Sequence, residues 1–148
     1  MNSENIKNLN SILEGEYGAI NSFDTIIEHA KNEKTKNELQ RIQQTHKKLT
    51  SHIATRIQNL GGNPIDGIGI EGIISETISN IKHIGTTDTI SYLKEALQSE
   101  NMGIKIVNEL LAVSSDPSSS QLLNTIINEY QTNITSIDNL INTSSDIQ

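Results

Sequence analysis

The chain has 148 residues, a length that suits one domain with a single core, and we expect residues 1–148 to form that domain. It contains no cysteine, which excludes disulfides and thiolate metal ligands. A formal net charge of -7 and an aromatic content of 3% argue against nucleic acid and anionic membranes as partners. The N-terminus does not resemble a signal peptide, and no apolar stretch approaches the roughly 18 residues of a membrane span, so we expect a soluble, cytoplasmic protein.

The first predicted helix begins near Ser3 and runs to about Lys31. Its apolar positions alternate by three and four residues, which is the spacing of a coiled-coil seam: Ile6, Leu9, Leu13, Ile20, Phe23, Ile27 and Ala30. Glu16 falls in the middle of this seam. A buried carboxylate at that position needs a hydrogen-bonding partner or a cation.

The second predicted helix begins at Thr35, because Thr35-x-x-Glu38 has the spacing of a capping box, and it ends at Gly61-Gly62. Its seam again alternates by three and four residues over most of its length: Leu39, Ile42, His46, Leu49, Ile53 and Leu60. Only a few residues separate this helix from the first. The two should therefore form an antiparallel hairpin.

A longer connection of roughly 25 residues leads to the third helix. Isoleucines at helical spacing predict a short extra helix within it, from about 70 to 84: Ile70, Ile73, Ile74, Ile78 and Ile81. The connection can travel the ~40 Å length of a helix of about 26 residues at about 1.5 Å per residue. The second and third helices could then run parallel, as in a bundle with one long crossover.

The third helix should start at Thr87 or Asp88, and Asp116-Pro117 predicts the N-cap and first residue of the fourth. Glu100 interrupts the third seam, which otherwise contains Ile90, Leu93, Leu97, Ile104, Val107 and Leu111. The apolar face of the fourth helix is broader than these seams and contains Leu123, Ile126, Ile127, Tyr130, Ile134, Ile137 and Ile141. Glu129 lies at its border. These patterns predict an all-α protein, a four-helix bundle with a long crossover that contains a short extra helix.

Four stretches carry a resemblance to a known family. "LNSILEGEYGAINSF", "QQTHKKL" and "RIQNLGGNP" resemble the first two helices of bacterioferritin and its relatives in the ferritin-like superfamily. The stretch "GTTDTISYLKEALQSENMGIKIVNELL" resembles small ferritin-like families. The resemblance implies a diiron-carboxylate bundle in which helices one and three each give a glutamate and helices two and four each give Glu-x-x-His.

At those positions the resemblance implies that Glu16, His46, Glu100 and Glu129 are metal ligands, with Gln43 at a fifth ligand position. It further implies iron, or else manganese or zinc, as the cofactor, and a homo-oligomer, a dimer or larger. The implied role is iron handling or oxidative or general stress defence.

The sequence departs from the family pattern at two ligand positions. Gln43 stands where the resemblance implies a glutamate, and Thr132 where it implies a histidine. A neutral amide cannot bridge two cations as a carboxylate does, and a hydroxyl is a poorer ligand than an imidazole. Three carboxylates and one imidazole could hold one ion, so we expect metal binding with reduced or absent ferroxidase activity.

Other interpretations of the same residues stay open. A glutamate in a seam can be protonated, or hydrogen-bonded to a neighbour such as Gln43 or Thr132, and fix only the register of the helices. Glu129 could lie on a solvated face. The alternative function is a helical protein-interaction module that has lost its metal site, with the crossover isoleucines as its docking face.

Overall fold

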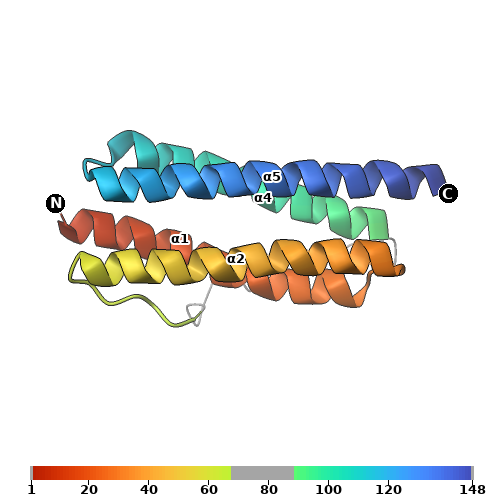
Figure 1. Cartoon of the computed structure of the whole chain (residues 1–148), viewed down its shortest axis with the longest axis horizontal. Helices are drawn as coiled ribbons and strands as arrows, with labels where there is room; N and C mark the ends of the chain where they lie inside the picture. The colour runs from red at the N-terminus through yellow and green to blue at the C-terminus, as the bar shows by residue number, and fades with distance from the viewer. Residues whose placement is uncertain (1, 68–88, 148) are drawn as a thin grey trace.

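Long amphipathic helices account for almost all of the structure. The computed structural model describes residues 2–67 and 89–147, with side chains as far as residue 143. Its helices are α1 (Asn2–Glu28), α2 (Glu33–Asn59), α4 (Thr89–Val113) and α5 (Pro117–Ile147) (Figure 1). The extra helix predicted at about 70–84 lies outside the described residues. None of the described helices is long and apolar enough to cross a membrane.

The four helices pack as two hairpins side by side. α1 packs mainly against α2 and α4 against α5, while α1 also contacts α4 and α2 contacts α5. The colours of Figure 1 show that α2 and α4 run in the same direction along the bundle. The predicted all-α four-helix bundle with one long crossover is therefore confirmed.

The ends of α2 follow from local chemistry, with one correction at its start. The side chain of Asn32, not Thr35, caps the helix, because Asn32 Oδ1 accepts a hydrogen bond of 2.7 Å from the backbone N–H of Thr35. The predicted stop is confirmed. Gly61 has a φ of 87°, and the N–H of Gly62 donates to the carbonyl of Ile57 at 2.9 Å, which closes the last turn.

Asp116 caps α5 as predicted. Its Oδ2 accepts a hydrogen bond of 3.2 Å from the backbone N–H of Ser119, and Pro117 is the first helical residue. The same carboxylate pairs with Arg56 near the end of α2. This contact ties the two hairpins together at one end of the bundle.

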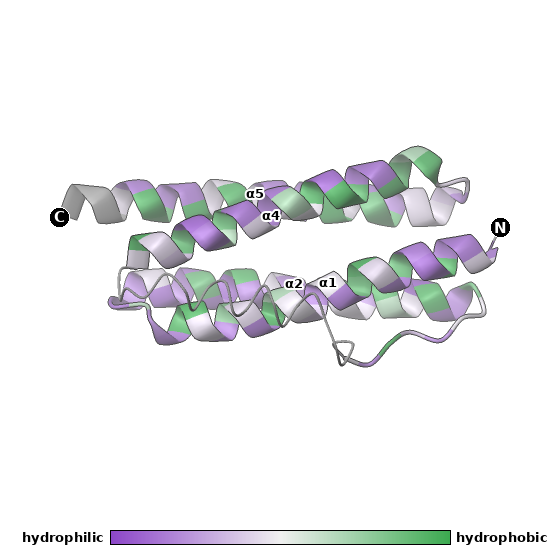
Figure 2. Ribbon diagram, turned by 180° about the vertical axis from the view of Figure 1, so that it is seen from behind, coloured by the Kyte–Doolittle hydropathy of each residue, from purple (hydrophilic) through white to green (hydrophobic). Residues whose placement is uncertain are grey.

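A polar layer separates two apolar halves of the core. One half is formed by Leu9, Ile12, Leu13, Leu49, Ile53, Ile57, Val107, Leu123, Ile126, Ile127 and Tyr130. The other is formed by Phe23, Ile26, Leu39, Ile42, Tyr92, Leu93, Ala96, Ile137 and Leu140. Figure 2 shows apolar residues interleaved with polar ones along every helix. The buried polar residues near the middle of the helices belong to the site described next.

Candidate functional site

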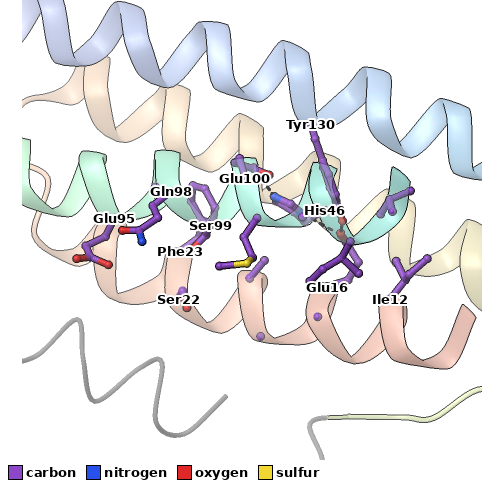
Figure 3. Close-up of a pocket in the computed structure, with 18 of the residues that line it drawn as sticks. Ile12, Glu16, Ser22, Phe23, His46, Glu95, Gln98, Ser99, Glu100 and Tyr130 are labelled. Atoms are coloured by element: carbon purple, nitrogen blue, oxygen red, sulfur yellow. Dashed lines mark hydrogen bonds and ion pairs between the residues drawn. The ribbon is translucent and has the colours of Figure 1, made fainter. Parts of the chain in front are cut away.

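His46 lies between two carboxylates in the middle of the bundle. Its Nδ1 is 2.8 Å from Oε2 of Glu16 on α1, and its Nε2 is 2.7 Å from Oε1 of Glu100 on α4 (Figure 3). None of the three residues is more than 3% exposed. Both ring nitrogens face carboxylate oxygens, and an imidazole can donate from both at once only when the ring is protonated.

α5 supplies two further donors to the same carboxylates. The hydroxyl of Tyr130 donates to Oε1 of Glu16, and Nδ2 of Asn133 donates to Oε1 of Glu100 at 3.0 Å. These residues are three positions apart and share one face of the helix. A Cβ atom at Gly103 of α4 would lie 2.8 Å from the Tyr130 ring, so the glycine allows the phenol to approach α4 closely.

The electrostatics of the cluster favour a charged imidazole. Burial alone would lower the pKa of His46, but the charge of Glu16 and the hydrogen bond and charge of Glu100 outweigh it and raise the pKa to about 10. Burial, followed by the charge and hydrogen bond of Glu16, raises the pKa of Tyr130 well above its usual value. The phenol therefore remains a donor. With both carboxyl groups ionised, the cluster carries a formal charge of about -1.

The structure directs Gln43 away from this cluster. The residue is buried, but its Nε2 donates to the carbonyl of Ile20 at 2.9 Å and to Oδ1 of Asp24 at 2.8 Å. The amide is thereby held against a later turn of α1 than the one that carries Glu16. One of the open interpretations placed a hydrogen bond between Glu16 and Gln43. In the structure Gln43 bonds to Ile20 and Asp24 instead.

The two predicted positions on α5 also lie outside the cluster. Glu129 is half-buried and acts electrostatically on Arg41 of α2. Thr132 is exposed, and its hydroxyl donates to the carbonyl of Asn128 at 3.1 Å. The residues of α5 that face the cluster are instead Tyr130 and Asn133, each one position further along the helix.

Sequence reasoning missed Asn133, although a signal for it was present. Apart from Ile127, the buried positions of α5 from Leu123 onward alternate by three and four residues: Leu123, Ile126, Tyr130, Asn133, Ile137 and Leu140. Asn133 occupies a position of this alternation, so the spacing predicts its burial although the residue is polar. The broader apolar stripe instead favoured Ile134, which is only half-buried.

The donor set suits one divalent cation better than two. Two carboxylates and one imidazole converge from three helices, and those donor types suit iron, manganese or zinc. Among the residues that the structure describes, however, no three His, Asp or Glu side chains are arranged to hold an ion as they stand. The His46 ring donates to both carboxylates, so a cation would have to displace its proton. Within the described part of the chain, a second ion lacks donors, because α5 presents a phenol and an amide.

A cavity of about 460 Å³ adjoins the cluster between α1 and α4. Glu16, His46, Glu100 and Tyr130 contribute to its wall, as Figure 3 shows. The buried polar layer is thus reachable from one side of the bundle.

The topology is that of a ferritin-like four-helix bundle, and solved structures agree on this fold. Over all of this chain, a two-domain protein with DJ-1/ThiJ/PfpI-like and ferritin-like domains from Anabaena variabilis matches with a TM-score of 0.80 and 16% identity. The chain spans 39% of that protein's length. The dodecameric thioferritin from Bacteroides fragilis, a bacterioferritin-related protein, matches over 99% of this chain and 89% of its own, with a TM-score of 0.79 and 15% identity.

A ferritin-like, diiron-carboxylate protein from Bacillus anthracis strain Ames also matches. It covers 95% of this chain and 96% of its own, with a TM-score of 0.72 and 20% identity. The chain belongs to the family described as Domain of unknown function (DUF2383), whose model matches residues 4–113. No curated protein sequence matches it.

Proposed function

We propose that this chain is a ferritin-like metal-binding protein whose polar layer binds one divalent cation, iron or alternatively manganese or zinc. Glu16, His46 and Glu100 are the proposed ligands. The observation that carries the proposal is their convergence, with His46 within 2.8 Å of both carboxylates in the core. Three separate helices each contribute one metal-ligating side chain at the same level of the bundle.

Charge balance supports a single ion. Two carboxylates and a neutral imidazole offset the charge of one divalent cation, so the loaded cluster would be neutral in the apolar core. Loading would release the second proton of His46, since a ligating imidazole must be neutral. Tyr130 and Asn133 would keep their hydrogen bonds to the carboxylates and so hold these ligands in orientation. A bound cation would supply Lewis acidity or, for iron, redox capacity.

The proposed site is mononuclear, with reduced or absent ferroxidase activity. Gln43 and Glu129, which the resemblance also places among the ligands, lie outside the cluster and are not included. Without them, a second cation would have no bridging carboxylate and no second imidazole. Coupled oxidation of two irons by dioxygen would therefore be impaired.

Elemental analysis after anaerobic loading tests the proposal. Protein incubated with Fe(II), Mn(II) or Zn(II) and then desalted should retain about one equivalent of one of these metals, the number that a single three-ligand site holds. The Glu16→Gln, Glu100→Gln double variant should retain almost none, while Glu129→Gln, the matched control, should bind like the wild type. Circular dichroism verifies that each variant is folded. The proposal would be refuted if the wild type retained no metal after loading, or if the double variant retained as much metal as the wild type.

We also propose that the chain forms a homo-oligomer. Large apolar side chains are exposed on α4, with Met102 at 53%, Ile106 at 44% and Val113 at 69% exposure, and the similar protein from Bacteroides fragilis is dodecameric. Such exposure favours contact with another protein surface. Light scattering coupled to size-exclusion chromatography tests this, and a monomer at micromolar concentration would contradict it. An oligomer that binds no metal would favour the alternative function, a helical interaction module.

A further inference from the structure

The cavity between α1 and α4 exists because small residues face each other across it. Gly15 and Ala19 of α1 lie opposite Ala96, Ser99 and Gly103 of α4 in its lining. A Cβ atom placed on Gly15 would meet no other atom within 4 Å. The space of about 460 Å³ falls in the range of small-molecule sites, which are mostly apolar with a few placed polar groups.

The cavity wall is acidic. Glu16, Glu95 and Glu100 all contribute to it, and among the residues that the structure describes no lysine or arginine does. His46 also lines the wall, but both of its ring nitrogens are occupied by carboxylates. The lining is therefore negative whether or not the imidazole is protonated. This charge favours a cationic occupant over a neutral or anionic one.

One carboxylate oxygen at the inner wall lacks a partner. Oε1 of Glu100 accepts from both His46 and Asn133, whereas Oε2 accepts no hydrogen bond from any residue that the structure describes. Glu100 is only 3% exposed as a residue, but it lines the cavity and its Oε2 keeps some accessible surface. An acceptor that is accessible and has no protein donor can take a hydrogen bond from a donor placed in the cavity.

We propose that this cavity binds a small organic ammonium ion with an aliphatic body. The ammonium group donates to Oε2 of Glu100, in a charge-assisted hydrogen bond. The aliphatic chain lies along the apolar part of the lining, which includes Phe23, Met102 and Ile106. Figure 3 shows Phe23 and Ser99 on the stretch between Glu100 and Glu95, the carboxylate at the far end of the cavity.

The test measures binding of n-hexylammonium to the metal-free, chelator-treated protein by calorimetry, with 1-hexanol and hexanoate as probes of matched length. We expect n-hexylammonium to bind at least about tenfold more tightly than 1-hexanol, the factor that one charge-assisted hydrogen bond provides, and hexanoate not to bind. Equal affinities for the ammonium and the alcohol, or no binding of the ammonium, would overturn the proposal.

Two variants locate the site. Gly15→Leu adds a large side chain at a residue that lines the cavity, and it should abolish n-hexylammonium binding. The substitution raises helix propensity, so the variant should fold. Ser51→Leu adds the same side chain at an exposed position of α2 outside the cavity and should bind like the wild type. If Gly15→Leu binds n-hexylammonium unchanged, the proposed location is wrong.

The inference goes beyond the proposed metal site and can fail separately from it. Calorimetry is done without metal, so a protein that takes up no cation during loading can still bind the ammonium ion. A protein that loads one cation and ignores n-hexylammonium would refute only the cavity proposal.

Discussion

Replacing His46 by glutamine should make the free energy of unfolding less dependent on pH in the alkaline range. In the metal-free protein, the imidazolium of His46 compensates the charges of Glu16 and Glu100, with all three residues buried. His46→Gln removes that positive charge and leaves two carboxylates in the core without it. The variant should therefore be clearly less stable than the wild type near neutral pH.

The size of the effect follows from the pKa of His46. Folding raises that pKa from 6.5 to about 10, so between these values the folded state binds more protons than the unfolded state. The stabilisation is fully present below 6.5 and is lost as pH rises through about 10. Since one pKa unit corresponds to about 1.4 kcal/mol, the loss over this window is on the order of 5 kcal/mol.

Urea unfolding of both proteins in EDTA, from about pH 6 to about pH 10.5, measures this difference directly. The gap in unfolding free energy between wild type and His46→Gln should shrink as pH rises. His52→Gln changes an exposed histidine of the same helix and should follow the wild type throughout. A constant gap between wild type and His46→Gln, or an imidazole that is neutral at pH 8 by nitrogen NMR, would refute the charged cluster.

Four further outcomes are expected. Tyr130→Phe removes the donor to Glu16 and should lower the urea-derived unfolding free energy by about 1–3 kcal/mol. Gly103→Ala, whose Cβ would lie 2.8 Å from the Tyr130 ring, should lower it by roughly 1–3 kcal/mol and shift the tyrosine ring resonances in NMR spectra. Asn32→Ala removes the cap on Thr35 and should cost about 1 kcal/mol in the same assay. EDTA should leave the helical circular dichroism unchanged, because the carboxylates keep their protein donors. A loss of helical circular dichroism on addition of EDTA would contradict this last prediction.

Much of the fold could be predicted because its signals are local. The seams of α1, α2 and α4 repeat every three or four residues, and Gly61 and Asp116 mark helix ends by their own chemistry. The predicted start of α2 was wrong because Asn32 and Thr35 are both residue types that cap helices. Only the observed hydrogen bond from the Thr35 N–H to Asn32 distinguishes the two.

The site was predictable on three helices and not on the fourth. Glu16, His46 and Glu100 each interrupt a narrow seam, so their burial could be read from position alone, and the structure brings them together. The stripe of α5 is wide, and a rotation of one residue decides between Glu129 and Tyr130. That rotation depends on packing against α4, where Gly103 leaves room for the tyrosine ring.

The hydrogen bonds from α5 explain how one cluster could exist with either a proton or a cation. Tyr130 and Asn133 contact oxygens of Glu16 and Glu100 and do not contact the His46 ring. Neither bond involves the imidazole proton, so both donors could stay in place if that proton were lost. A carboxylate and an imidazole at these two positions would instead add ligands and negative charge, which only further cations offset. In this chain α5 thus provides hydrogen-bond donors to the cluster where the resemblance implies ligands.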